Sequence, residues 1–196
     1  MPPAPAATRR SGGFAVAAAL LVVGAYLYEK NKEIDETGTG EITASTSPLA
    51  VQMGPSGLAL PRFVSLKSDK VNVRKGPSST HDVAWIFHRK GLPVEIVAEY
   101  ENWRKIRDSE GAEGWILQQM LSGKRSAIVM TYGHAAGAPL TKSPDTRSNV
   151  MAQLKSGVTG FVDACDGTWC EFEAQGFAGY VSQARLWGVY PGEIID

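Results

Sequence analysis

Between Arg62 and Gly123, apolar residues alternate with polar ones in short runs, which is the pattern of β-strands that bury one face. The runs are Val71/Val73, Val83/Trp85/Phe87, Val94/Ile96/Ala98, Trp103 to Ile106 and Trp115 to Leu117. Turn sequences rich in Gly, Pro, Asn and Ser separate these runs, and no stretch has a helical period. Five or more strands in about 60 residues cannot form a large sandwich, so the pattern predicts a small, strongly bent β-barrel.

The same pattern returns in weaker form from about Ser126 to Gly188. Trp103 and Trp169 stand 66 positions apart, and each begins a similar run. Other matched pairs are Pro77/Pro144, Val83/Val150, Gly91/Gly157, Gly114/Gly179 and Gly123/Gly188. The second series of strands centres on Val150, Leu154, Phe161, Val162, Phe172, Tyr180 and Val181. The chain is therefore predicted to be all-β, with two tandem barrels.

The phrases of the first repeat resemble the bacterial SH3-like (SH3b) domain family, in the tandem exported form of alphaproteobacterial type. They are Lys70-Val-Asn-Val-Arg-Lys-Gly-Pro77, Lys90-Gly-Leu-Pro-Val-Glu-Ile-Val97, Asn102-Trp-Arg-Lys-Ile-Arg107 and Glu113-Gly-Trp-Ile116. The second repeat departs from the family pattern, with Lys142-Ser-Pro144 and Gly179-Tyr180 at the matching places. The resemblance implies two SH3-like barrels, and a role as a cell-wall-targeting or envelope-associated module.

The resulting domain prediction has four parts. Residues 1–28 are a signal peptide or membrane anchor, 29–61 a flexible linker, 62–125 the first SH3-like domain and 126–196 a divergent second one. Arg9 and Arg10 precede an apolar segment at residues 14–28, which is shorter than the roughly 20 residues that usually span a bilayer. A cleaved signal and a retained anchor both fit. Either one predicts a location in the periplasm, or on the inner membrane facing the periplasm.

Charge is balanced over the whole chain but not between the repeats. Residues 62–126 carry twelve basic and eight acidic side chains, whereas residues 127–196 carry four and seven. The difference could dock one repeat on the other, could mark the first repeat as the face for an anionic partner, or could reflect two ordinarily solvated surfaces.

Aromatic and basic residues of the first repeat form the candidate ligand-binding set: Tyr100, Trp103, Trp115, Arg104 and Arg107. Indole rings stack on sugar rings or extended peptides, and guanidinium groups pair with carboxylates. Arg89-Lys90 and Lys124-Arg125 are expected to extend the basic part of this groove. The competing interpretation is core packing for the aromatic residues and a solvated surface for the basic ones. Trp85 is expected in the core, because it alternates with Val83 and Phe87.

Cys165 and Cys170 flank a four-residue turn that would place their sulfur atoms across a hairpin from each other. An oxidising compartment favours a disulfide, and two free thiols are the alternative. No histidine stands at zinc-ligand spacing, so neither a metal nor another cofactor is predicted. The sequence contains no nucleophile motif, phosphate loop or paired carboxylates, which predicts a protein that is not an enzyme. An exported chain with no net charge also argues against a nucleic-acid partner.

Two functions remain open at this point. The first is an exported binding module that docks on peptidoglycan or on an envelope protein or peptide, and contacts the membrane through residues 14–28 if that segment is not cleaved. The second is a structural envelope scaffold. In that case the two barrels pack on each other, bury the groove aromatics and bind no small ligand.

Overall fold

The structure, a computed structural model, describes residues 52–130 and 137–196. The predicted signal or anchor at 1–28 and most of the predicted linker lie outside these residues. Residues 49–196 form one compact unit that contains both repeats. The described residues have no α-helix, and their only helical turns are the 3-10 helices η1 (Gln118–Met120) and η2 (Gln183–Arg185). The prediction of an all-β chain is confirmed.

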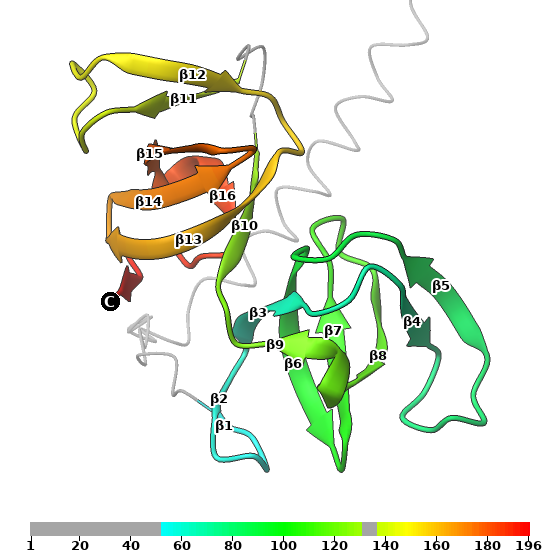
Figure 1. Cartoon of the computed structure of the whole chain (residues 1–196). Helices are drawn as coiled ribbons and strands as arrows, with labels where there is room; N and C mark the ends of the chain where they lie inside the picture. The colour runs from blue at the N-terminus through cyan, green and yellow to red at the C-terminus, as the bar shows by residue number, and fades with distance from the viewer. Residues whose placement is uncertain (1–51, 131–136) are drawn as a thin grey trace, which may run out of the picture. The chain divides into compact units, whose positions relative to one another are not determined.

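The first repeat forms a seven-stranded antiparallel sheet that curls on itself (Figure 1). Its strands, in spatial order, are β5 (Val83–Phe87), β4 (Val71–Arg74), β8 (Glu113–Leu117), β7 (Trp103–Arg107), β6 (Pro93–Tyr100), β3 (Arg62–Leu66) and β9 (Leu121–Ser122). The inward side chains make one core, which consists of Val64, Leu66, Val71, Val73, Val94, Ile96, Ile106 and Ile116. Trp85 packs against this core while remaining partly exposed. Every apolar run predicted for this repeat lies in a strand.

The second repeat forms an eight-stranded sheet with a corresponding order. Its strands are β12 (Val150–Leu154), β11 (Ala138–Thr141), β15 (Phe177–Ser182), β14 (Trp169–Ala174), β13 (Thr159–Asp166), β10 (Ser126–Val129) and β16 (Leu186–Trp187), with β17 (Ile194–Ile195) paired to β13. Its core includes Phe172, Leu140, Val129 and Val181, together with both cysteines. The two repeats therefore build two separate cores of similar construction.

In each sheet, one outer hairpin is joined to the rest by a single registered pair of residues. The hairpin β4–β5 reaches β8 through Arg74 opposite Trp115, and β11–β12 reaches β15 through Thr141 opposite Tyr180. Gly114 and Gly179 stand directly before these contacts. The sharp bend that turns a flat sheet into a barrel thus falls at equivalent places in both repeats.

Part of the predicted linker is ordered. Residues 52–60 form a hairpin of two short strands, β1 (Gln52–Met53) and β2 (Ala59–Leu60), which leads into β3. The backbone nitrogen and the hydroxyl of Ser56 donate hydrogen bonds of 2.9 and 2.8 Å to the carboxylate of Glu99 on β6. The prediction of a flexible linker over 29–61 is therefore wrong for residues 52–60, because a buried carboxylate far along the chain holds this segment.

Aromatic and polar groups make contacts between the two repeats. The ring of Phe63 lies 5.1 Å from that of Trp187 and 4.7 Å from that of Tyr190, centroid to centroid. The Tyr190 hydroxyl donates a 2.9 Å hydrogen bond to the buried carboxylate of Glu95. These contacts use aromatic residues other than those proposed to line a groove.

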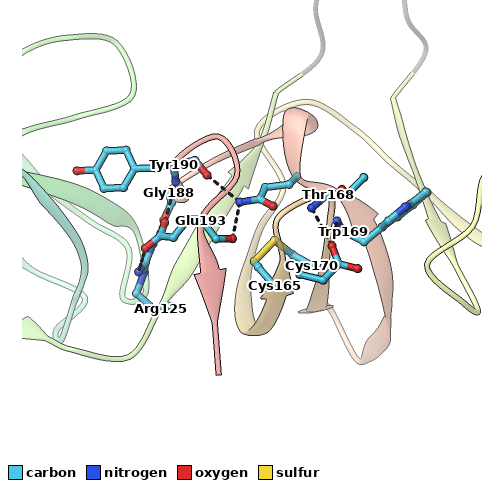
Figure 2. Close-up of a disulfide and its surroundings, with 10 residues drawn as sticks. Arg125, Cys165, Thr168, Trp169, Cys170, Gly188, Tyr190 and Glu193 are labelled. Atoms are coloured by element: carbon cyan, nitrogen blue, oxygen red, sulfur yellow. Dashed lines mark hydrogen bonds and ion pairs between the residues drawn. A yellow bond between two sulfur atoms is a disulfide. The ribbon is translucent and has the colours of Figure 1, made fainter. Parts of the chain in front are cut away.

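An ion pair also joins the repeats. The guanidinium of Arg125 donates to both carboxylate oxygens of Glu193, at 2.8 and 3.0 Å (Figure 2). Burial by itself would raise the pKa of Glu193, but the hydrogen bonds from Arg125 and from the backbone of Tyr190 outweigh burial and lower it. Arg125, which was expected in the basic groove, instead pairs with Glu193 where the repeats meet.

Candidate ligand-binding face

One side of the first barrel gathers aromatic and basic side chains that alternate with core residues. Ile106 on β7 and Ile116 on β8 are fully buried, so the residues next to them in each strand point outward. Directly opposed residues of antiparallel strands lie on the same side of the sheet. The opposed pairs here are Tyr100/Trp103, Trp103/Leu117, Lys105/Trp115, Arg107/Glu113 and Arg74/Trp115. We call this surface, formed by Arg74, Tyr100, Trp103, Lys105, Arg107, Trp115 and Leu117, the aromatic–basic face.

A cavity of about 200 Å³ opens beside Trp103 on this face. Its lining residues are Lys70, Asn72, Arg74, Trp103, Leu117 and Met120. Trp103 is only 8% exposed, so its ring forms part of the wall and does not project into solvent. Tyr100, by contrast, is 52% exposed. The cavity combines an indole and two aliphatic side chains with two cations and an amide, a mixture that suits a polar ligand with a flat or apolar part.

The polar residues of the cavity were not predicted as site residues. Lys70, Asn72 and Arg74 occupy alternate positions around the buried Val71 and Val73 of β4, and this alternation was readable in the sequence. What the sequence does not show is that β4 bends next to β8, which brings these three residues beside Trp103.

Lys105 and Arg107 share one carboxylate on the face. The Lys105 ammonium lies 2.7 Å and the Arg107 guanidinium 2.8 Å from opposite oxygens of Glu113. The hydrogen bonds from Lys105 and then Arg107 lower the pKa of Glu113, and the bond to Glu113 raises the pKa of Arg107. Arg107 also lies 3.2 Å from the carboxylate of Glu95, so two carboxylates hold these two cations in place and balance their charge. The unpaired charge that an anionic group of a ligand can meet is that of Lys70 and Arg74 in the neighbouring cavity, for which no ion pair is found among the described residues.

Arg104 does not belong to the face. Its side chain points to the other side of β7 and is 8% exposed, with its Nε 3.2 Å from the Glu99 carboxylate. It also donates to the side chain of Gln118 and to the backbone oxygens of Glu101 and Trp103. Of the five residues predicted to contact a ligand, the structure brings four to one surface and places Arg104 in a separate network on the other side of β7.

The rest of the predicted basic groove is also dispersed. Arg89, Lys90 and Lys124 lie near Thr159 and Phe161 of the second repeat: Arg89 donates a 3.3 Å hydrogen bond to Thr159, and the Lys124 ammonium sits 3.8 Å above the Phe161 ring. The prediction of a single basic groove around the aromatic residues is corrected to two separate basic clusters.

The equivalent surface of the second barrel carries the opposite charge. Trp169 and Tyr180 match Trp103 and Trp115, but Glu171 stands where the first repeat has Lys105. The Tyr180 hydroxyl donates a 2.7 Å hydrogen bond to Glu171, and this bond raises the pKa of the tyrosine. The adjacent cavity of about 410 Å³ also includes Asp166 and Asp196. A ligand that is attracted to the first barrel by its negative charge would be repelled here.

The predicted cystine is present. Cys165 and Cys170 are opposed residues of β13 and β14, and a disulfide joins them (Figure 2). Both side chains are buried in the core of the second barrel. The carboxylate of Asp166 accepts hydrogen bonds from the backbone of Trp169 and Thr168, which lower its pKa and close the turn between the cysteines. The disulfide and the turn together fix the position of Trp169.

Two further observations concern only the described part of the chain. Among residues 52–130 and 137–196, no group of three or more His, Cys, Asp or Glu side chains is arranged to hold a metal ion. Within these same ranges, no helix has the length and apolar character needed to cross a bilayer.

Comparison with known proteins gives a family match over both repeats. The profile of the family described as "Bacterial SH3 domain" matches residues 67–123 and 134–188, which together make up more than half of the chain. No curated protein matches the sequence.

Solved structures described as NlpC2 and NlpC1 from Trichomonas vaginalis are each 13% identical to the chain, with TM-scores of 0.30 and 0.29. These matches cover 65% and 64% of this chain, and 48% and 45% of the other chains. The chain thus spans about half the length of each of these two structures.

Proposed function

Because the chain belongs to the bacterial SH3 domain family, whose members are typically binding modules, we propose that it is a non-enzymatic binding module of the cell envelope. Its ligand is peptidoglycan, or an extended segment of an envelope protein. The apolar segment at 14–28 after Arg9 and Arg10 supports export to the periplasm, either as a soluble protein or held on the inner membrane.

The observation that carries this proposal is the aromatic–basic face. Trp103 lines a cavity with Lys70, Asn72 and Arg74, and Tyr100 and Trp115 lie on the same side of the sheet. Stacking on the rings and pairing of carboxylates with the basic residues would hold a glycan or peptide that carries acidic groups. Such a ligand fits the charge of the first barrel and not that of the second.

The scaffold alternative has one observation in its favour, which is that the repeats do pack against each other. However, it requires the groove aromatics to be buried by that packing. The contacts between the repeats use Phe63, Trp187 and Tyr190, and they leave Tyr100 exposed. The binding proposal is therefore favoured over a scaffold without a ligand.

Cosedimentation of the full chain, kept in a mild detergent, with purified peptidoglycan sacculi over a salt series tests the proposal. Trp115→Ala removes a partly exposed ring of the face, and we expect it to weaken binding about tenfold or more, as loss of a central aromatic contact does at other binding surfaces. Trp169→Ala, at the counterpart of Trp103 in the second repeat, is the matched control and should retain binding. Thermal unfolding of each variant shows whether the fold is intact.

Each outcome has a distinct meaning. Binding that persists at moderate salt and is lost in the Trp115 variant supports recognition of the wall by the face. Binding that weakens as the salt concentration rises, and that is unchanged in the Trp115 variant, reflects general charge attraction. No binding by the natural chain rejects peptidoglycan as the ligand and directs the search to envelope proteins.

A further inference from the structure

A cavity of about 640 Å³ lies where the two repeats meet, and none of its lining residues belongs to the aromatic–basic face. The first repeat contributes Arg89, Lys90 and Gly91 to it. The second repeat contributes residues 155–161 and 173–175. We call this cavity the inter-repeat cleft.

The cleft is built from equivalent turns of the two repeats. Gly91 and Gly157 are matched positions, and each stands two residues before the long strand of its own sheet, β6 or β13. Their φ angles of 77° and 82° lie in the left-handed region that glycine tolerates best. The duplication of the barrel therefore places two copies of one tight turn at the same cavity.

The side chains around the cleft are mainly cationic. Arg89, Lys90 and Lys155 line it, and Lys124 covers the Phe161 ring that forms part of its wall. A single acidic residue, Glu173, is also in the lining. Within residues 52–130 and 137–196, none of the four basic side chains forms an ion pair, whereas Lys105, Arg107 and Arg125 all do so elsewhere. The cleft thus gathers four cations against two carboxylates, that of Glu173 and that of Asp69, which accepts a hydrogen bond from the backbone of Lys90, so a net positive charge remains.

The backbone of the two turns favours separated carboxylates over a compact phosphate. Phosphate sites commonly use several free amide N–H groups that point at one anion. Here the amide of Gly91 donates to Leu66, that of Gly157 to Val129, and that of Lys90 to Asp69. What remains for a ligand is a set of charges at the ends of long, flexible side chains, which can meet carboxylates spaced along a chain.

We propose that the inter-repeat cleft binds an acidic peptide segment, with Lys90 and Lys155 meeting carboxylates from the two sides of the cavity. This is a second site on the chain. It does not depend on the aromatic–basic face or on peptidoglycan being the ligand of that face.

Calorimetric titration of the full chain in detergent at low salt tests the site. The probe is an acetylated, amidated peptide of six glutamates, with the six-glutamine peptide and inorganic phosphate as comparison ligands. Lys90→Gln and Lys155→Gln should each weaken binding of the glutamate peptide about threefold to fivefold, and the double variant about tenfold or more. Lys142→Gln removes an exposed lysine of the second repeat that does not line the cleft, and it should leave the affinity unchanged.

The variants avoid the contact between Arg89 and Thr159, so the packing of the repeats is not their target. The expected result is binding of the glutamate peptide, with little binding of the other two ligands and a loss confined to the cleft variants. The proposal is overturned if the glutamate peptide does not bind, or if Lys142→Gln weakens binding as much as Lys155→Gln. Tighter binding of phosphate than of the peptide would also overturn it.

Discussion

Glu99 accepts hydrogen bonds from Arg62 and Ser56 and forms an ion pair with Arg104, although its side chain is only 1% exposed. Arg62 lies 2.6 Å away, Ser56 contributes its amide and hydroxyl, and Arg104 approaches at 3.2 Å. Burial alone would raise the pKa of this carboxyl, but the hydrogen bonds from Arg62 and Ser56 and the charge of Arg104 outweigh it and lower the pKa to about 2. The folded chain therefore strongly prefers the ionised form.

A depressed carboxyl pKa stabilises the fold above the ordinary pKa of the unfolded chain, and this stabilisation is lost as the pH falls from about 4.5 to about 2. We expect Glu99→Gln to lower the free energy of unfolding at pH 7 by on the order of 3 kcal/mol and to flatten its dependence on pH in that window. Urea unfolding followed by tryptophan fluorescence at several pH values measures both effects.

Glu110→Gln is the matched control, since Glu110 is an exposed turn residue for which no side-chain hydrogen bond or ion pair is found in the described part of the chain. It should change neither the stability nor its pH dependence. Equal behaviour of the two variants would contradict the role assigned to Glu99.

At the residue scale, the aromatic side chains could be placed from the sequence, whereas the partners of Arg104 could not. Tyr100, Trp103 and Trp115 share a face, as the predicted groove requires, although their binding role remains a prediction. Arg104 was grouped with them by adjacency. Regular alternation within β7 already puts Arg104 on the same side as the buried Ile106, and this was readable in the sequence. What the sequence does not display is the partner of Arg104, because a bulge between Ile96 and Ala98 sets the register that places Glu99 opposite it.

Among the elements, the strands with clear alternation were all predictable, and the short ones were not. Strands β1, β2 and β16 each have only two residues, which is too few to show a period. They form because other groups hold them, as Glu99 holds the first hairpin. The contact between β4 and β8 could not be predicted from the sequence either, because it consists of one pair of opposed residues and needs a glycine that permits close approach of the strands.

Gly114 makes this approach possible. A Cβ atom there would lie closer to a methyl carbon of Val73 than real contacts allow, and 3.2 Å from the backbone oxygen of Arg74, which is tighter than most real contacts. We expect Gly114→Ala to push the β4–β5 hairpin away from β8 and to lower the free energy of unfolding by about 1–3 kcal/mol. Gly123→Ala is a suitable control, since a Cβ at Gly123 meets nothing within 4 Å.

Chemical denaturation of the two variants, side by side, measures the difference. The same change should weaken binding at the aromatic–basic face, because Arg74 and Trp115 meet at that contact. A Gly114 variant as stable as the natural chain would show that the hairpin adjusts without cost.

For the whole molecule, the sequence revealed two barrels and their unequal charge, but not how they meet. Charge asymmetry suggested docking through opposite surfaces. The actual contacts combine one ion pair, Arg125 with Glu193, with aromatic packing around Phe63 and the bond from Tyr190 to Glu95. The sequence did not mark Phe63 and Tyr190 as contacts between the repeats, because a residue at such an interface has the same local pattern as one in a core.

Burial, and then the hydrogen bond to Glu95, raise the pKa of Tyr190. A raised tyrosine pKa stabilises the fold below the ordinary value of about 10, and this stabilisation is lost as the pH rises further. We expect Tyr190→Phe to lower the free energy of unfolding at pH 7 by about 1–2 kcal/mol and to reduce its decline above pH 10. Tyr100→Phe, which alters an exposed tyrosine, should do neither.

Thermal unfolding at neutral and alkaline pH distinguishes the two tyrosine variants. If the bond also couples the repeats, the Tyr190 variant should show a broader transition, as the barrels begin to unfold separately. A sharp, unshifted transition would mean that the aromatic packing around Phe63 suffices to join them.

The hairpin at residues 52–60 determines how the molecule would respond to mechanical load. A pull on the chain ahead of Gln52 acts on the open end of the hairpin, where Gln52 faces Leu60, so its bonds would break one after another and not all together. Release of its nine residues would lengthen the chain by roughly 30 Å, at about 3.4 Å per residue, before force reached the barrels. The hairpin would thus unfold before the barrels do and take up part of the load, and the hydrogen bonds from Ser56 to Glu99 would resist its opening.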